Sequence, residues 1–155
     1  MRERSGYELP LLLLGAFRSI IDDLHAELAR RGHAQARPIH GFALQAIGEE
    51  AITIGELGRR LGVSKQAAAK TARSLEQAGY VRRSPHADDG RSWTLTRTKR
   101  GTEMLALSAQ IFDRIHRRWI GELGQERIRN LEEDLARLAS ATPPASVSNL
   151  PGWLQ

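Results

Sequence analysis

Residues 64 to 73 place polar and cationic side chains at the spacing of one face of a helix. Ala68, Ala72 and Leu75 would face inward, so the side chains between them point outward. Cationic groups bind phosphate oxygens, and a glutamine side chain can bind adenine through two hydrogen bonds. The predicted chemistry is therefore recognition of a nucleic acid. The candidate contacts are Ser64, Lys65, Gln66, Ala67, Lys70 and Arg73.

These candidates divide into two roles. The serine and the three cations suit phosphate oxygens, which position a protein without reading base sequence. Gln66 suits the edge of an adenine, and Ala67 suits a thymine methyl group. Alanine is also a strong helix former, so for Ala67 a purely structural role is an equal alternative.

A second stretch, SPHADDGRSW at residues 84–93, has two acids and a glycine before an arginine. Its proline and glycine predict a hairpin loop. Arg91 would lie at the tip, where a guanidinium can enter a minor groove. Asp88 or Asp89 can pair with Arg91 or cap the loop backbone, so we interpret both acids as support for the arginine. An ordinary Asx turn with an incidental arginine is the alternative.

Two short helices must position these groups. Thr53 and Glu56 have the spacing of a capping box, and the helix that they begin would end at Gly62. Ser64 would cap a second helix that ends at Gly79. This is the arrangement of a helix-turn-helix, and the strands YVRR and SWTLTR that follow would add a wing.

Longer amphipathic helices flank this module. The first should begin at Pro10 and end at Gly32, and a shorter one should follow Pro38. After Thr98, a predicted N-cap, a helix of about 24 residues should run about 36 Å before a final helix. The long first helix and the long helix after Thr98 have wider apolar stripes than a small winged domain can cover. A second copy of the chain is expected to cover them, with packing inside the monomer as the alternative.

The predicted fold is mainly α with a small β-hairpin wing (α+β). It is a winged helix-turn-helix flanked by dimerisation helices. Its parts are an N-terminal dimerisation helix, the winged module, C-terminal dimerisation helices and an extended or disordered tail, at residues 1–36, 37–98, 99–141 and 142–155.

Charge is distributed unevenly along the chain. The net charge is +5, and the sequence pI is about 10.4. Residues 59–101 hold 11 basic and 3 acidic residues, a net +8, which leaves −3 for the rest. One middle segment therefore carries all of the positive excess. This favours a polyanion-binding surface over an ordinary solvated face.

Several classes of function have no support in the sequence. There is no cysteine, and the five histidines are scattered, so neither a disulfide nor a metal site is predicted. No nucleophile has a neighbouring base, and no glycine loop could bind phosphate, so neither an enzyme nor a cofactor is predicted. The apolar run LPLLLLGAF is too short to cross a bilayer, and we expect a cytoplasmic protein without a membrane partner.

The stretch TIGELGRRLGVSKQAAAKTARSLEQAGYVRR, with DDGRS and the Thr98-x-x-Gly101 helix start, resembles the MarR family of bacterial transcription regulators. The resemblance covers the winged module closely and the flanking helices less specifically. It implies a homodimer, usually a repressor, on a pseudo-palindromic site. In many members a small, often aromatic, ligand enters between the dimer helices and the winged module and releases the DNA.

Residue by residue, the resemblance supports the serine, glutamine and three cations of the helix, together with Asp88 and Arg91 of the wing. One departure concerns the end of the second wing strand, where Arg97-Thr98 stands in place of the usual Leu-Thr. How that strand packs is therefore a question for the structure.

We therefore predict a sequence-specific DNA-binding transcription regulator that associates with the bacterial nucleoid when it is bound to DNA. Two alternatives remain at this stage. One is a sequence-neutral architectural DNA-binding protein, and the other is a winged-helix module that binds an acidic protein. No residue is predicted for effector binding.

Overall fold

The computed structural model describes residues 5–139 apart from 89 and 91. Its elements follow in chain order: α1 (Glu8–Arg30), α2 (Pro38–Ile47), β1 (Ile52–Thr53), α3 (Ile54–Leu61), α4 (Lys65–Gln77), β2 (Val81–Pro85), β3 (Trp93–Arg97), α5 (Lys99–Leu123) and α6 (Gln125–Ala139). The predicted fold class, mainly α with a small antiparallel sheet, is confirmed. The predicted tail at residues 142–155 lies outside the described residues.

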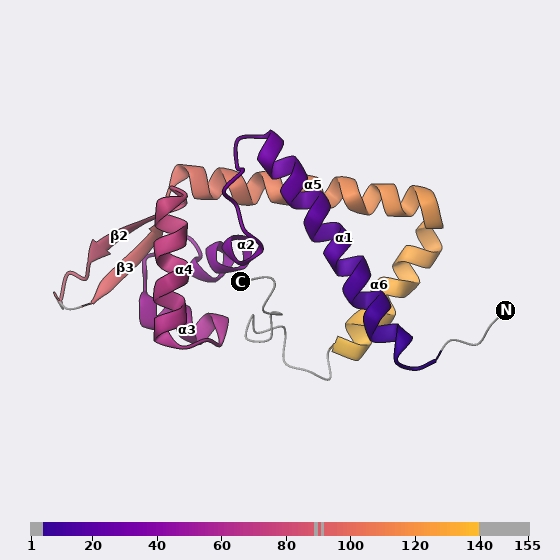
Figure 1. The fold of residues 1–155 in the computed structure, drawn as a ribbon, viewed down its shortest axis with the longest axis horizontal. Coiled ribbons are helices and arrows are strands. Elements are labelled where there is room, and N and C mark those ends of the chain that lie inside the picture. Colours follow the sequence, from indigo (N-terminus) through magenta and orange to yellow (C-terminus); the bar gives the residue numbers. More distant parts are fainter. Residues whose placement is uncertain (1–4, 89, 91, 140–155) are drawn as a thin grey trace.

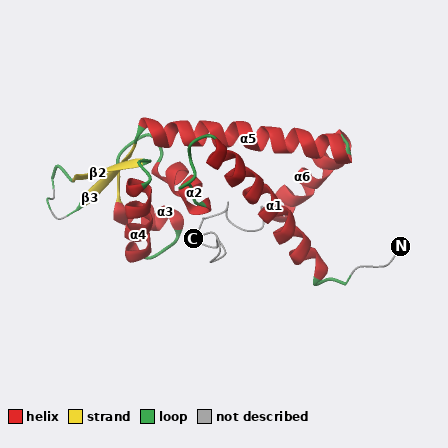
Figure 2. Cartoon of the chain, turned by 45° about the horizontal axis from the view of Figure 1, so that its top comes forward, coloured by secondary structure: helices red, strands yellow, loops and turns green. Residues whose placement is uncertain are grey.

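Helix α5 gives the molecule its length (Figure 1). The sheet and the helices α2, α3 and α4 lie at the N-terminal end of α5, and α6 turns back from the other end. Helix α1 packs against α5 and projects away from the winged module. Figure 2 shows the same separation from a second direction, with the β2–β3 hairpin farthest from α6.

Side-chain caps begin three helices as the sequence predicts. In each case a hydroxyl oxygen accepts a hydrogen bond of 3.1 Å from a backbone N–H three residues later. The capping residues are Thr53, Ser64 and Thr98. The capping box of α3 is only half formed, because the Glu56 side chain pairs with Arg59 and Arg60 instead of the Thr53 backbone. Gly62 ends α3 in the left-handed region at φ 64°, which glycine adopts without strain.

The sheet has one more strand than the sequence indicates. Its order is β1-β3-β2, and both pairings are antiparallel. Strand β1 has only two residues, Ile52 and Thr53, which pair with Leu95 and Thr94. A two-residue strand has no periodicity of its own, so only the distant β3 reveals it.

A single apolar core runs from α1 to α5. Leu28, Leu44, Leu75 and Met104 come from four different helices, and each is at most 1% exposed. Leu95 of β3 is fully buried within the same cluster. The winged module and the long helices therefore share one core, and this packing fixes the position of the module relative to the helices.

Arg97 resolves the question raised at the end of the second wing strand. Its Nε donates a hydrogen bond to the carbonyl oxygen of Gly48, at the end of α2. The strand end is thus anchored by a polar contact where the related pattern has a leucine. None of the helices in the described part of the chain is long and apolar enough to cross a membrane.

Candidate nucleic-acid interface

Helix α4 turns one face to the core and the other to solvent. Ala68, Ala72 and Leu75 are fully buried. Lys65, Gln66, Lys70 and Arg73 are all exposed, whereas Ala67 is half-buried. The predicted division of the helix is therefore observed. The structure brings the three cations and the glutamine together on the outer face of α4. Figure 1 shows the helix itself at the end of the molecule opposite α6.

Ser64 has a structural task at the start of this helix. Its Oγ accepts a hydrogen bond from the Ala67 N–H at 3.1 Å, which satisfies one of the free donors of the first turn. The side chain is exposed, so its hydroxyl proton is still available to an acceptor in solution. Capping and phosphate contact are therefore compatible in one residue.

Gly58 of α3 brings the two short helices together. A β-carbon at this position would lie 3.2 Å from the Val63 carbonyl oxygen and 3.5 Å from the β-carbon of Ala68. A larger residue would push α4 away from α3. The sequence analysis did not single out this glycine. A glycine within a short helix, opposite an alanine of the next helix, is a signal that could have identified it.

A hydrogen bond from His86, a residue that the sequence analysis did not single out, joins the two ends of the wing loop. The His86 N–H donates to the Ser92 carbonyl at 2.9 Å. The Asp88 N–H in turn donates to Nδ1 of His86 at 3.2 Å. Asp88 therefore lies in the wing loop, where it was predicted. Arg91 and Asp89 lie outside the described residues.

On its inner side α4 is fastened to α2. Nδ1 of His40 accepts from the Arg37 N–H at 3.2 Å, so Nε2 carries the ring proton and donates it to Oγ of Ser74 at 2.8 Å. The His40 side chain is 1% exposed, and burial lowers its pKa to about 4. The ring is therefore neutral near pH 7, as the hydrogen bond that Nδ1 accepts from Arg37 requires.

Tyr80 and Arg100 connect the end of α4 to the α1–α2 loop. The Tyr80 hydroxyl lies 3.0 Å from Nδ1 of His33, and burial raises the pKa of Tyr80. Arg100 lies over the Tyr80 ring at 5.4 Å and donates to the carbonyls of Gly32 (2.8 Å) and Ala78 (3.2 Å). The orientation of α4 is therefore coupled to the loop that leads into α2.

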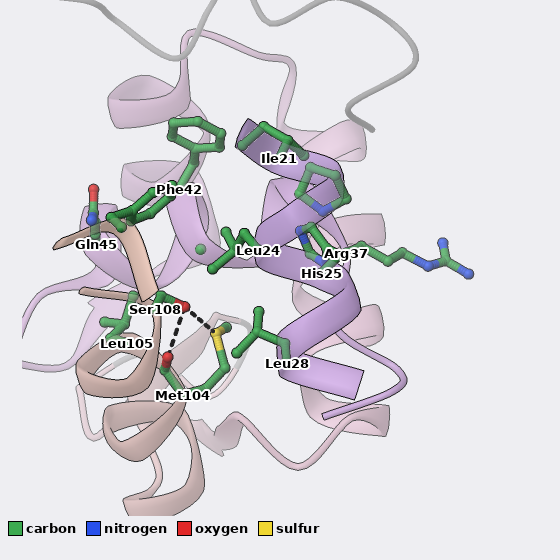
Figure 3. Close-up of a pocket in the computed structure, with 13 residues that line it drawn as sticks. Ile21, Leu24, His25, Leu28, Arg37, Phe42, Gln45, Met104, Leu105 and Ser108 are labelled. Carbon is green, nitrogen blue, oxygen red and sulfur yellow. Dashed lines mark hydrogen bonds between the residues drawn. The ribbon is translucent and has the colours of Figure 1, made fainter. Parts of the chain in front are cut away.

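A small cavity of about 60 Å³ lies between α1, α2 and α5. Apolar side chains make most of its wall, among them Leu24, Phe42 and Met104 (Figure 3). Ser108 also faces it, but the hydroxyl donates to the Met104 carbonyl at 2.8 Å within its own helix. His25 lines the same cavity, and burial is the main cause that lowers its pKa. In the described part of the chain, no three histidine or acidic side chains gather into a metal site.

Comparison with known proteins agrees with this geometry. Residues 37–92, from the start of α2 into the wing, match the model of the MarR family. The structure of MarR is 25% identical, covers 91% of this chain and 92% of its own, and has a TM-score of 0.65. The segment that includes most of the winged module is therefore similar to the MarR family, and the chain has the fold of MarR.

Two further structures have the same fold over most of this chain. A MarR family protein from Bacillus stearothermophilus is 20% identical with a TM-score of 0.69, over 93% of this chain and 99% of that one. The S. aureus MepR–DNA complex is 16% identical with a TM-score of 0.65, over 90% and 99%. None of the curated proteins searched matches the chain. The MarR family consists of transcription regulators rather than enzymes.

Proposed function

We propose that the chain is a sequence-specific DNA-binding regulator that occupies a pseudo-palindromic operator as a homodimer. The observation that carries this proposal is the exposed row Lys65, Gln66, Lys70 and Arg73, on a helix whose opposite face is fully buried. MepR has the same fold and has been solved in complex with DNA, which supports the proposal that the polyanion bound by this chain is DNA.

In this proposal the N-terminal half of α4 enters the major groove. Gln66 reads an adenine edge, and Ala67 contacts a thymine methyl group. Ser64 and the three cations bind phosphate. Arg91 enters the adjacent minor groove, and Asp88 and Asp89 support the wing loop that carries it.

Exposed leucines support the homodimer. The first half of α1 leaves Leu9, Leu11, Leu12, Leu13 and Leu14 between 38% and 61% exposed. Helix α6 adds Leu131, Leu135 and Leu138 at 38% to 70%. A helix that exposes this much leucine is stable in water only when another surface covers it. A second copy would cover both surfaces and place two α4 helices on successive major grooves.

The cavity between α1, α2 and α5 is the candidate binding site for a small-molecule effector. Its volume of about 60 Å³ is less than half of the roughly 150 Å³ that holds a benzene ring in an engineered protein cavity. An aromatic ligand would therefore have to move α2 away from α1 and α5. Because His40 ties α2 to Ser74 of α4, such movement would change the spacing of the two reading helices and weaken DNA binding.

A gel-shift titration against the DNA upstream of the chain's own gene tests the proposal. We expect tighter binding to this DNA than to random DNA. We also expect log affinity to fall linearly with log salt, with a slope of about −0.9 per phosphate contacted. Equal affinity for both DNAs would favour the architectural alternative, and a flat salt dependence would favour the protein-binding one.

Base selection then tests the individual contacts. Gln66→Ala should relax preference at one base pair of each half-site, at a cost of about 1–3 kcal/mol, whereas Lys70→Ala should weaken binding to all sequences alike. Arg91→Ala should cost about 1–3 kcal/mol in DNA binding at matched salt. Unchanged affinity in Arg91→Ala would remove this residue from the interface.

A further inference from the structure

One face of the β2–β3 hairpin packs on the apolar core, and this face continues toward the tip beyond the end of the core. Arg83 of β2 pairs with Leu95, and Pro85 pairs with Trp93. Directly opposed residues share a face of an antiparallel sheet, and so do residues two apart. Arg83, Trp93 and Leu95 therefore point to the same side. Leu95 is fully buried, whereas Trp93, two rungs nearer to the tip, is 42% exposed.

Arg83 joins the wing to helix α4. Its guanidinium carbon lies 4.7 Å from the centroid of the Trp93 ring. Its Nε lies 3.6 Å from Oε2 of Glu76, an exposed residue near the C-terminal end of α4. Within the described part of the chain this buried Nε has no hydrogen-bond partner. The side chain therefore contacts the Trp93 ring through a cation–π interaction and Glu76 through opposite charge.

The Arg83 contacts support the part of the hairpin that lies beyond the apolar core. A two-stranded hairpin without packing on one face has little stability of its own. The Arg83 side chain is 24% exposed and lies in contact with both Trp93 of the hairpin and Glu76 of α4. The face of a tryptophan attracts a cation, and the planar guanidinium can lie on that face while it remains near a carboxylate.

We propose that Arg83 is a positioning residue that sets the angle between the wing and α4 through its contacts with Trp93 and Glu76. The proposal rests on the proposed DNA-binding function, in which α4 and the wing must enter a major and a minor groove at the same time. A wing free to swing would lose orientational freedom on binding, and this entropic cost would weaken contact in the flanking minor groove.

Arg83→Lys tests this role, because lysine keeps the charge and loses the planar stacking group. Arg82→Lys is the matched control, since Arg82 is exposed and belongs to the adjacent rung of the same strand, where it pairs with Thr96. We expect Arg83→Lys to weaken operator binding by roughly tenfold. Hydroxyl-radical protection should be lost at the outer minor grooves, and guanine-N7 methylation protection should persist in the central major grooves. Arg82→Lys should change neither pattern.

Fluorescence tests the same contact without DNA. With Trp119 and Trp153 replaced by phenylalanine, Trp93 is the remaining tryptophan. We expect its emission to shift to longer wavelength in Arg83→Lys, because the ring loses its cover, and to stay unchanged in Arg82→Lys. Circular dichroism verifies that each variant is folded.

The outcomes separate the two proposals. Wild-type protein without preference for its operator would overturn the proposed function. Wild-type preference, with flanking protection and Trp93 emission unchanged in Arg83→Lys, would overturn only the role of Arg83. Equal loss of protection in both grooves would also overturn it, because it would make Arg83 a general contributor to binding and not a positioning residue.

Discussion

Gly101 lies against the backbone of Tyr80, and a β-carbon at this glycine would be 2.2 Å from the Tyr80 carbonyl oxygen. The same oxygen accepts a hydrogen bond of 3.0 Å from the Thr98 N–H. Helix α5 therefore begins in direct contact with the residue that follows α4 and its terminal turn. Any side chain at position 101 would separate the long helix from the winged module.

Gly101→Ala should lower the free energy of unfolding by about 2 kcal/mol or more, because overpacking outweighs the gain in helix propensity. Gly121→Ala on the same helix is the control. Apart from the backbone of its own helix turn, no atom lies within 4 Å of the β-carbon it would add, so this variant should be unchanged or slightly more stable. Urea unfolding measures both. Equal stability of the two variants would contradict the close contact.

The buried His40 predicts a loss of stability in acid. Burial lowers the pKa of His40 from its ordinary value of 6.5 to about 4 in the folded chain. The unfolded chain therefore binds the proton first as pH falls. The contribution of His40 to stability should be complete above about pH 6.5, and it should decrease between pH 6.5 and 4. The slope is at most about 1.4 kcal/mol per pH unit.

Urea unfolding of wild type and His40→Gln between pH 7.5 and 4 measures this contribution. The variant should be less stable at pH 7.5, because the Ser74 and Arg37 partners are lost, and its stability should depend less on pH. Burial also lowers the pKa of His25 and His33, so some dependence should remain. Parallel curves for the two proteins would show that His40 does not titrate in this window.

Two substitutions at Ser64 separate capping from DNA contact. Ser64→Ala removes the cap of α4 and should cost about 1 kcal/mol of stability. Ser64→Asp keeps a capping oxygen and places a negative charge at the helix N-terminus, so stability should be retained. The same charge should repel DNA phosphates and weaken binding. Thermal unfolding and gel shifts measure the two effects. DNA affinity equal to wild type in Ser64→Asp would place Ser64 outside the interface.

The exposed leucines of α6 predict the oligomeric state. Leu131→Glu combined with Leu135→Glu should raise the dimer dissociation constant at least about 100-fold, because charged groups would enter an apolar interface. Glu133→Gln is the control, since it changes only an exposed pair with Arg129 at 3.8 Å. Light scattering at micromolar concentration measures the mass. A doubly substituted chain that stays dimeric would contradict the interface.

Much of the local structure was predictable because it depends on near neighbours. The caps at Thr53, Ser64 and Thr98 each join residues three positions apart, so the residue types alone indicate them. The exposed face of α4 follows from helical periodicity in the same way. The predicted start of the first helix at Pro10 was two residues late, since α1 begins at Glu8. Proline is favoured anywhere in a first turn, and so it does not specify a single start.

The amino-acid sequence by itself determined where the capped helices α3, α4 and α5 begin, which face of α4 meets solvent and where positive charge gathers. These features depend on residue type and on spacing within one or two turns. Only the tertiary structure decided that Ile52 pairs with Leu95, that Arg97 reaches Gly48, and that His40 holds Ser74. Each of these contacts joins residues more than thirty positions apart. No local pattern encodes such a pair, because the packing of the whole core brings its members together.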